Sequence, residues 1–459
     1  MKKWLSFVLA ALLALSAPAL AAGEASPSPS PEPPAPVVSA LADPQPQCKA
    51  AVLLYADNGE VFYDFHGSDH NFPASITKVM TALLTLEAVD RGELSLEQVV
   101  TCSNTFQFDL SDDGSTQNIK PGEELTVHEL LYCALVASAN EACNILAETV
   151  AGSAAAFIQR MNERAAQLGM ENTHFANCHG LHQANHYTSA RDLGKLVQAA
   201  LQNETFQAIV SSKSHTTPAT NLTDDRTYIN TNALLTGARY PGYTYPNAIG
   251  VKTGSTPEAG QCLASAAIKD GRTIICIVLG AENLPNEDGT VTRNSFVESR
   301  RLLEWGFENF SRRTLLDGVT PVKEIPVTLS ADTTAVALKP QERLEAILPN
   351  DMDPAGFQRV ITTYQEELEA PIQAGQELGE ITVRNGDTVY GTVKLVAAAS
   401  AERSELLYRL HQVKLFFQNI WVRVGLVALA VLVVALLLRR SVVRRRSRRR
   451  GYTGRKRRR

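Results

Sequence analysis

Residues 72–80 read Phe72-Pro73-Ala74-Ser75-Ile76-Thr77-Lys78-Val79-Met80. A loop that contains a proline gives way here to an apolar run, residues 79–88, which predicts a helix that ends near Gly92. A serine and a lysine three residues apart share one face of such a helix, so their side chains can form a hydrogen bond. A buried lysine loses its proton more readily than one in water, and its amine can then accept a proton from a serine hydroxyl. Ser75 and Lys78 are therefore a candidate nucleophile and general base.

Two further motifs follow in the order that an active-serine site requires. A serine and a lysine at this spacing recur by chance, and on their own they are better explained as part of a helix cap. However, Ser138-Ala139-Asn140 interrupts a helical stretch, residues 130–150, and Lys252-Thr253-Gly254 lies on a strand-like segment, residues 248–255. Ser-x-x-Lys, Ser-x-Asn and Lys-Thr-Gly occur together in penicillin-binding proteins and class A β-lactamases. The three motifs together favour an active-serine enzyme over unrelated local features.

The charge of the 459-residue chain is unevenly distributed. Residues 439–459 hold thirteen Lys and Arg and no acidic residue, so the formal net charge of −4 conceals an acidic middle. An acidic region repels the phosphate backbone, and we therefore expect no nucleic-acid partner. The basic tail alone could also be a patch for nucleic acid or anionic lipid, but its position after an apolar run is explained by a membrane anchor.

Both ends of the chain have membrane-related features. Residues 1–21 resemble a secretory signal peptide, with two lysines, an apolar run and the small-residue site Ala19-Leu20-Ala21. Residues 420–438 predict one transmembrane helix, and the arginines that follow place the tail, residues 439–459, in the cytoplasm. We therefore expect a single-pass protein of the bacterial cell membrane with its catalytic domain on the extracytoplasmic side.

Between these ends the pattern predicts a linker, two domains and a helix. Residues 22–47 are rich in proline and serine and predict an extended spacer. Residues 48–313 begin with a hairpin, are expected to be mainly helical over residues 93–170, and end with three antiparallel strands and a helix, which indicates an α/β (α+β) domain. Residues 314–400 contain regular short strands, typical of a small all-β sandwich. Residues 401–419 predict a juxtamembrane helix.

The cysteines and histidines offer alternative sources of chemistry. The seven cysteines are an odd number in an exported chain, so at least one is unpaired, and their scatter does not indicate any particular disulfide. Residues 174–186 hold four histidines and one cysteine, which suggests a metal site. Their spacing lacks the i, i+4 arrangement of ligands on a helix, and an active-serine mechanism requires neither a metal nor a cofactor. We interpret the segment as a structural loop.

With these motifs, the chain from Cys48 to Val396 resembles the serine D-alanyl-D-alanine carboxypeptidases, the low-molecular-weight penicillin-binding proteins. Asn172-Thr173-His174-Phe175, His179-Gly180-Leu181 and Ser189-Ala190-Arg191-Asp192 are also similar to stretches of that family. The resemblance implies a penicillin-binding/β-lactamase-like transpeptidase fold and removal of the terminal D-alanine from peptidoglycan stem peptides, in cell-wall biogenesis. The implied partners are stem peptides ending in D-Ala-D-Ala and β-lactam antibiotics.

The resemblance also implies catalytic roles. Ser75 would attack the carbonyl between the two D-alanines and form an acyl-enzyme. Lys78 would accept the proton of Ser75 as general base, and Ser138 would relay a proton toward the leaving nitrogen. Asn140 would hold the substrate's amide or orient Lys78.

The substrate-binding residues implied by the resemblance come mainly from the third motif. Lys252 and Thr253 would bind the terminal carboxylate. Gly254 would let the substrate backbone lie against the strand. Ser255 occupies a position that varies among relatives, and its N–H would form the oxyanion hole with the N–H of Ser75.

Three other functions share some of these features. A class A β-lactamase would need a glutamate for fast deacylation, and no Glu-x-x-Leu-Asn stretch lies between Asn140 and Lys252. A transpeptidase would use the same residues and remains open. A catalytically silent β-lactam- or wall-binding module would be expected to have lost at least one of the nucleophile, base and relay residues, whereas all three are present.

Overall fold

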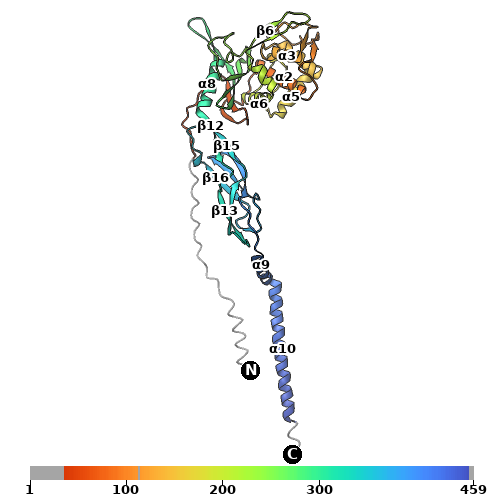
Figure 1. Ribbon diagram of the computed structural model, residues 1–459, viewed down its shortest axis with the longest axis vertical. Helices are drawn as coiled ribbons and strands as arrows, with labels where there is room; N and C mark the ends of the chain where they lie inside the picture. The colour runs from red at the N-terminus through yellow and green to blue at the C-terminus, as the bar shows by residue number, and fades with distance from the viewer. Residues whose placement is uncertain (1–35, 112–113, 454–459) are drawn as a thin grey trace, which may run out of the picture.

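The computed structural model describes residues 36–111 and 114–453, and its domains follow one another along the long axis (Figure 1). A domain of helices and a sheet forms one end, a β domain comes next, and helices α9 (Glu405–Gln418) and α10 (Ile420–Thr453) form the other end. The expected signal peptide, the first part of the expected linker and the last six residues of the tail lie outside the described residues.

The first domain is built on a five-stranded sheet in which every neighbouring pair is antiparallel. Its strands, in spatial order, are β2 (Val61–Phe65), β1 (Ala50–Tyr55), β9 (Arg272–Ala281), β8 (Gly260–Lys269) and β7 (Ala248–Thr256). The expected hairpin and the three expected strands are therefore correct, and β1 joins them by pairing with β9 along its whole length.

Both faces of this sheet are covered, which explains why β1 is apolar at every position. Ala50, Val52 and Leu54 pack into the core that holds the helices, while Leu53 and Tyr55 pack with the residues of α8 (Asn294–Asn309) on the other face. α6 (Ala190–Ala200) crosses the first face, next to β1 and β9. In Figure 1, α8 lies on the side away from α2, α3, α5 and α6.

Helix α2 (Lys78–Asp90) runs through the middle of the helical part and is buried on nearly every side. It contacts five other helices: α3 (Val127–Leu135), α4 (Asn140–Ala151), α5 (Ala154–Gln167), α6 and α7 (Glu204–Ser211). A helix that is apolar all round is stable only in such surroundings. One turn of 3₁₀-helix, η1 (Ala74–Thr77), leads directly into it.

The expectation that residues 93–170 are mainly helical is wrong for residues 93–126. Their only regular elements among the described residues are the short paired strands β3 (Val99–Thr101) and β4 (Glu124–Thr126). The intervening segment is rich in Ser, Thr, Asp, Asn and Gly, whose side chains favour turns over helix. Tertiary contacts hold it in place, because the buried Glu123 carboxylate accepts hydrogen bonds from Thr220, Thr223 and Arg226.

The β domain has two sheets around one core, as expected of a small sandwich. The larger sheet has the order β16 (Gln358–Thr363), β18 (Glu377–Asn385), β19 (Thr388–Ala397), β14 (Ala335–Pro340), β13 (Lys323–Thr328), β17 (Leu368–Glu369). The smaller one pairs β12 (Phe310–Leu316) with β15 (Leu344–Pro349). Leu316 and Leu348 of the small sheet share the core with Leu338, Ile381 and Leu395 of the large one.

Residues 36–47, the end of the expected linker, form no helix or strand, but they are in contact with both domains. Val37 makes two hydrogen bonds to the side chain of Asn385, and Ser39 donates to Asp351, so the segment lies along the β domain. Farther on, Tyr63 donates to Asp43 and Arg301 donates to the Pro44 carbonyl. We call residues 36–47 the strap.

One segment of the described chain is long and apolar enough to cross a membrane. It spans Ile420–Ser441 within α10 and has a mean hydropathy of 2.7, and none of its most apolar stretch is buried. The seven cysteines are all unpaired, and six of them are buried.

Candidate active site

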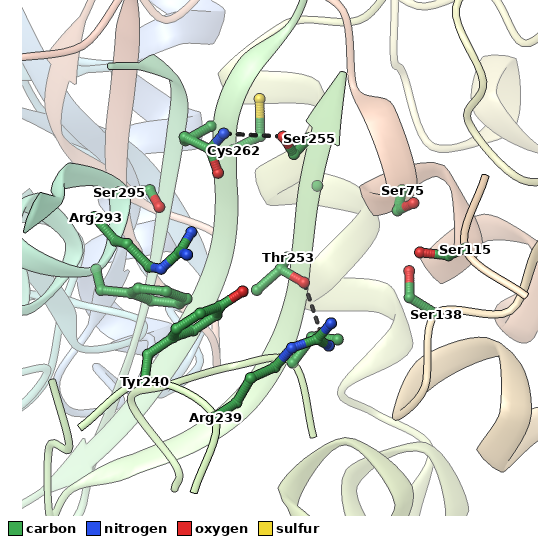
Figure 2. Close-up of a pocket in the computed structure, with 14 residues that line it drawn as sticks. Ser75, Ser115, Ser138, Arg239, Tyr240, Thr253, Ser255, Cys262, Arg293 and Ser295 are labelled. Carbon is green, nitrogen blue, oxygen red and sulfur yellow. Dashed lines mark hydrogen bonds between the residues drawn. The ribbon is translucent and has the colours of Figure 1, made fainter. Parts of the chain in front are cut away.

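The structure brings the three motifs together from three separate elements. η1 and the first turn of α2 carry Ser75 and Lys78, the turn between α3 and α4 carries Ser138, and the edge strand β7 carries Lys252 and Thr253. β7 packs against η1, so the nucleophile lies beside the strand. Figure 2 shows Ser75 and Ser138 facing Thr253 and Ser255 across a cavity of about 240 Å³.

Lys78 is fully buried, and its ammonium has three partners. It donates to Ser75 Oγ at 2.8 Å, to Asn140 Oδ1 at 2.7 Å and to the His179 carbonyl at 2.6 Å. The amide and carbonyl oxygens can only accept hydrogen bonds, so they would keep two N–H groups of a neutral amine. The remaining lone pair would then point at the Ser75 hydroxyl. This geometry fits a general base whose one lone pair is directed at the hydroxyl of the nucleophile.

The electrostatic surroundings favour that neutral form. Burial lowers the pKa of Lys78 to about 8, and the effect of burial outweighs the nearby cysteines and Glu141, which act in the opposite direction. Burial and the charge of Lys78 hold the pKa of Lys252 well below its usual range. Two buried amines close together cannot both be charged without a large cost, so the packing makes both amines easier to deprotonate than a lysine in water.

The second and third motifs are connected by hydrogen bonds. Lys252 Nζ donates to Ser138 Oγ at 3.0 Å and to the Thr253 carbonyl at 3.0 Å. Thr253 Oγ1 donates to Thr231 Oγ1 at 2.7 Å, and both hydroxyls line the cavity. No hydrogen bond between Lys78 and Ser138 is present among the described residues; Ser138 is instead coupled to Lys252. Asn140 is coupled to Lys78 and lies at the start of α4.

Tight packing explains two glycines near the nucleophile. A Cβ on Gly254 would lie 2.9 Å from the Pro73 carbonyl oxygen and 3.2 Å from Ser75 N, so a side chain there would push η1 away from β7. A Cβ on Gly180 would overlap the Ala74 carbonyl oxygen, and φ at Gly180 is +96°. Ala74 and Ser138 themselves have positive φ values, a strained conformation that often occurs at functional sites.

The histidine-rich loop supports the site through its backbone and through one buried ring. The His179 carbonyl holds Lys78, and His186 Nε2 lies 2.8 Å from Thr77 Oγ1. Burial lowers the pKa of His186 to about 3, so the ring is neutral, and its Nδ1 accepts from the Ala176 N–H at 3.0 Å. Among the described residues, no group of three or more His, Cys, Asp and Glu side chains is placed to hold a metal ion.

Several residues of the cavity were not singled out from the sequence. Ser115 faces Ser138, and Arg239, Tyr240 and Arg293 form the opposite wall (Figure 2). They come from loops and from the residue before α8, and no motif surrounds them. Their position depends on the fold. Arg239 and Tyr240 alone have a sequence signal, the polar, turn-rich character of residues 211–247, which cleft rims and connecting loops share equally.

This arrangement can perform acyl transfer. The half-buried hydroxyl of Ser75 contacts the amine of Lys78, whose pKa is lowered, and the hydroxyl of Ser138 is close by. Arg239 and Arg293 supply positive charge on the opposite wall of the cavity. A substrate would therefore be expected to carry a carbonyl next to Ser75 and a negative charge near the arginines.

Comparisons with known proteins agree with this chemistry. The family model of the S11 peptidases, described as D-alanyl-D-alanine carboxypeptidase, matches residues 37–283, and the model of the penicillin-binding protein 5 C-terminal domain matches residues 310–403. The chain is 30% identical over 359 residues to D-alanyl-D-alanine carboxypeptidase DacF of Bacillus subtilis, covering 78% of this chain and 87% of that protein.

Solved structures show the same likeness. Penicillin-binding protein 5 of Haemophilus influenzae superposes with a TM-score of 0.61 at 25% identity, over 79% of this chain and all of that one. A mutant of the Streptomyces K15 DD-transpeptidase superposes with a TM-score of 0.51 at 29% identity, over 58% of this chain and all of that one.

Proposed function

The chain belongs to the D-alanyl-D-alanine carboxypeptidase family, and from this we propose that Ser75 cleaves the terminal peptide bond of peptidoglycan stem peptides that end in D-Ala-D-Ala. The observation that carries the proposal is the contact of Ser75 Oγ with Lys78 Nζ at 2.8 Å. Asn140 Oδ1 and the His179 carbonyl bind the two N–H groups of the neutral amine, so its lone pair is left for the Ser75 hydroxyl.

In the first step, Lys78 accepts the hydroxyl proton while Ser75 Oγ bonds to the carbonyl carbon. The N–H groups of Ser75 and Ser255 stabilise the negative charge on the carbonyl oxygen. The proton that Lys78 accepted would then pass through the hydroxyl of Ser138, which is held by Lys252, to the leaving nitrogen, so that the C–N bond breaks, D-alanine departs and Lys78 is neutral again. Asn140 orients Lys78, and Gly254 lets η1 and β7 approach closely enough for both N–H groups to face the same oxygen.

In the second step, water attacks the ester carbonyl and its proton passes to Lys78; the ester C–O bond then breaks, Lys78 returns the proton to Ser75 Oγ, and the shortened peptide leaves. A β-lactam would acylate Ser75 by the same first step, with its ring amide in place of the peptide bond. Its ring-opened amine stays attached to the acyl group, so it cannot leave the site as D-alanine does. This difference predicts a long-lived adduct with β-lactams.

The test uses a soluble fragment that starts at residue 36, to include the strap, and ends at Ser400. We expect it to release D-alanine from an N-acylated D-Ala-D-Ala peptide and to gain the mass of one penicillin molecule on the peptide that contains Ser75. The measurements are an enzymatic D-alanine assay and mass spectrometry at increasing times. Absence of D-alanine release, or an adduct that is lost as fast as it forms, would contradict the carboxypeptidase assignment and favour a β-lactamase.

We also propose that the apolar part of α10 anchors the protein in the membrane, with the catalytic domain outside the cell. Support comes from the exposed apolar stretch Ile420–Ser441 and from the arginines that follow it, since positive residues favour the cytoplasmic side.

The full chain should sediment with membranes, whereas a chain that ends at Ser404 should be released into the medium. In intact protoplasts, added protease should degrade the catalytic domain and leave an epitope placed after residue 459 untouched until the membrane is permeabilised. Sedimentation of both chains alike, or an epitope that is degraded in intact protoplasts, would refute the anchor or its orientation.

A further inference from the structure

Glu141 is a buried carboxylate beside the groups of the active site. It follows Asn140 in the first turn of α4 and is 2% exposed. Its Oε1 accepts hydrogen bonds from the Thr116 hydroxyl at 2.7 Å and from the Gln117 N–H at 2.5 Å. Its Oε2 is buried and has no hydrogen-bond partner among the described residues. A buried carboxylate oxygen without a partner is costly, so its charge is expected to have a compensating role.

The contacts of Glu141 fix one edge of the cavity. The Ser115 carbonyl accepts from the Asn140 N–H at 2.9 Å, and Glu141 holds the two residues that follow Ser115. Ser115 thereby lies next to Ser138 at the cavity (Figure 2). The same turn of α4 binds Lys78 through Asn140 Oδ1. The carboxylate therefore belongs to the turn that holds the proposed general base.

Among the described residues, Glu141 is the one carboxylate whose charge acts on Lys78. Burial lowers the pKa of Lys78 to about 8, and Cys143, Cys178 and Glu141 act in the opposite direction. Burial raises the pKa of Cys143 to about 11 and holds the pKa of Cys178 well above its usual range, so both thiols are neutral near pH 8. The negative charge that acts on Lys78 therefore comes from Glu141.

The other titratable groups around Lys78 do not replace this charge. Burial lowers the pKa of His186 to about 3 and also lowers the pKa of His179, so both rings are neutral. Lys252 on β7 can only add positive charge. Asp109 lies beyond the His179 ring, with Oδ1 3.2 Å from Nε2, and is partly exposed to water.

We propose that Glu141 is a positioning residue that serves as the counter-charge of Lys78 and stabilises its ammonium form each time the amine accepts a proton. The inference rests on the proposed function, because it concerns the base of the same reaction. When the Ser75 proton moves to Nζ, the nitrogen gains a positive charge inside a buried site, which is costly without a partner charge. A carboxylate already fixed by Thr116 and Gln117 stabilises that charge without reorganisation, as preorganised groups do in catalysis.

A purely structural role of Glu141 is the alternative, since an acidic residue in the first turn also stabilises a helix. Three substitutions separate the two roles. Glu141→Gln keeps the shape and an acceptor oxygen but removes the charge, Glu141→Ala removes both, and Glu141→Asp keeps the charge on a shorter side chain. A counter-charge predicts that the effects follow the charge, whereas a structural role predicts that they follow the size.

The experiment measures the second-order rate of acylation of the detergent-solubilised full chain by a fluorescent penicillin, from about pH 5.5 to about pH 10. Glu141→Gln and Glu141→Ala should both shift the midpoint of the pH profile downward by roughly 0.5 to 1.5 pH units, because the ammonium loses its counter-charge. The weaker base should make both variants about two- to fivefold slower than the wild type on the plateau and about as much faster below the midpoint. Glu141→Asp keeps the charge, so its midpoint should stay within about 0.3 pH units of the wild type.

Glu148→Gln is the matched control. Glu148 lies about two turns farther along α4 and likewise accepts hydrogen bonds from a neighbouring loop, but it is not among the groups that act on Lys78. Its substitution should leave the midpoint unchanged.

The proposal is overturned if Glu141→Gln and Glu141→Ala leave the midpoint unchanged or raise it, if Glu141→Asp shifts it as far as they do, or if Glu148→Gln shifts it too. Either uncharged variant suffices for the test, so it remains decisive if one of them does not fold. Failure of the proposed function would be seen separately, as a wild-type protein that penicillin does not label.

Discussion

Replacement of Ser75 by alanine is expected to abolish both D-alanine release and covalent labelling by penicillin. Ser75 is the only part of the proposed mechanism that forms a bond to the substrate, so no other group can substitute for it. We expect kcat to fall on the order of 10⁵- to 10⁶-fold, as when the nucleophile of a serine hydrolase is removed. The measurements are the D-alanine assay and in-gel fluorescence with a fluorescent penicillin.

The control for this variant is Ser95→Ala. Ser95 is an exposed serine in the loop after α2, far from the three motifs in the chain, and its substitution should leave labelling unchanged. Ser75 is half-buried, and its hydroxyl bonds with Lys78, so Ser75→Ala should unfold within a few degrees of the wild type. Equal labelling of Ser75→Ala and the wild type would show that another residue is acylated, and the mechanism would be refuted.

The second prediction is that Lys78→Met removes acylation almost completely. Methionine has nearly the volume of the buried lysine side chain, so it should fill the space without a cavity, but it cannot accept a proton. Loss of a general base costs about 10²- to 10⁴-fold, and we expect the rate of penicillin acylation, measured by stopped-flow fluorescence, to fall toward the upper end of that range.

The pH dependence provides an independent test of the same role. Because the pKa of Lys78 is about 8 and the neutral amine is the active form, wild-type acylation should rise as the pH increases through about 8 and then level off. The residual reaction of Lys78→Met should lack this step. A wild-type rate that falls over the same interval, or a Lys78→Met protein that is acylated at the normal rate, would mean that Lys78 is not the base.

The sequence was sufficient to predict what depends on short stretches. The family membership inferred from Ser75-x-x-Lys78, Ser138-x-Asn140 and Lys252-Thr253-Gly254 is confirmed, as are the sheet domain, the β-sandwich and the apolar C-terminal helix. The strands and most helices were also located correctly, because alternating apolar residues and helix periodicity are local signals.

Long-range contacts could not be predicted from the sequence. The pairing of β1 with β9 joins segments more than 200 residues apart, and nothing in the sequence of either strand indicates which strand it pairs with. Residues 93–126 were misassigned because contacts such as Glu123 with Arg226 determine their path, and these depend on the rest of the fold. The same holds for Arg239, which lines the cavity only because its loop is placed beside Thr253. The individual roles of the site residues remain predictions.

The strap gives the two domains a second, non-covalent connection. The chain itself passes between them at residue 310, from α8 into β12. In addition, residues 36–47 form hydrogen bonds with Asn385 and Asp351 of the β domain and with Tyr63 and Arg301 of the first domain. A domain held by one connection can rotate about it, whereas a domain held by two separate connections resists bending and twisting relative to its neighbour. With α10 in the membrane as proposed, this second attachment would keep the catalytic domain at a nearly constant distance from the β domain and so restrict how far it reaches from the lipid surface.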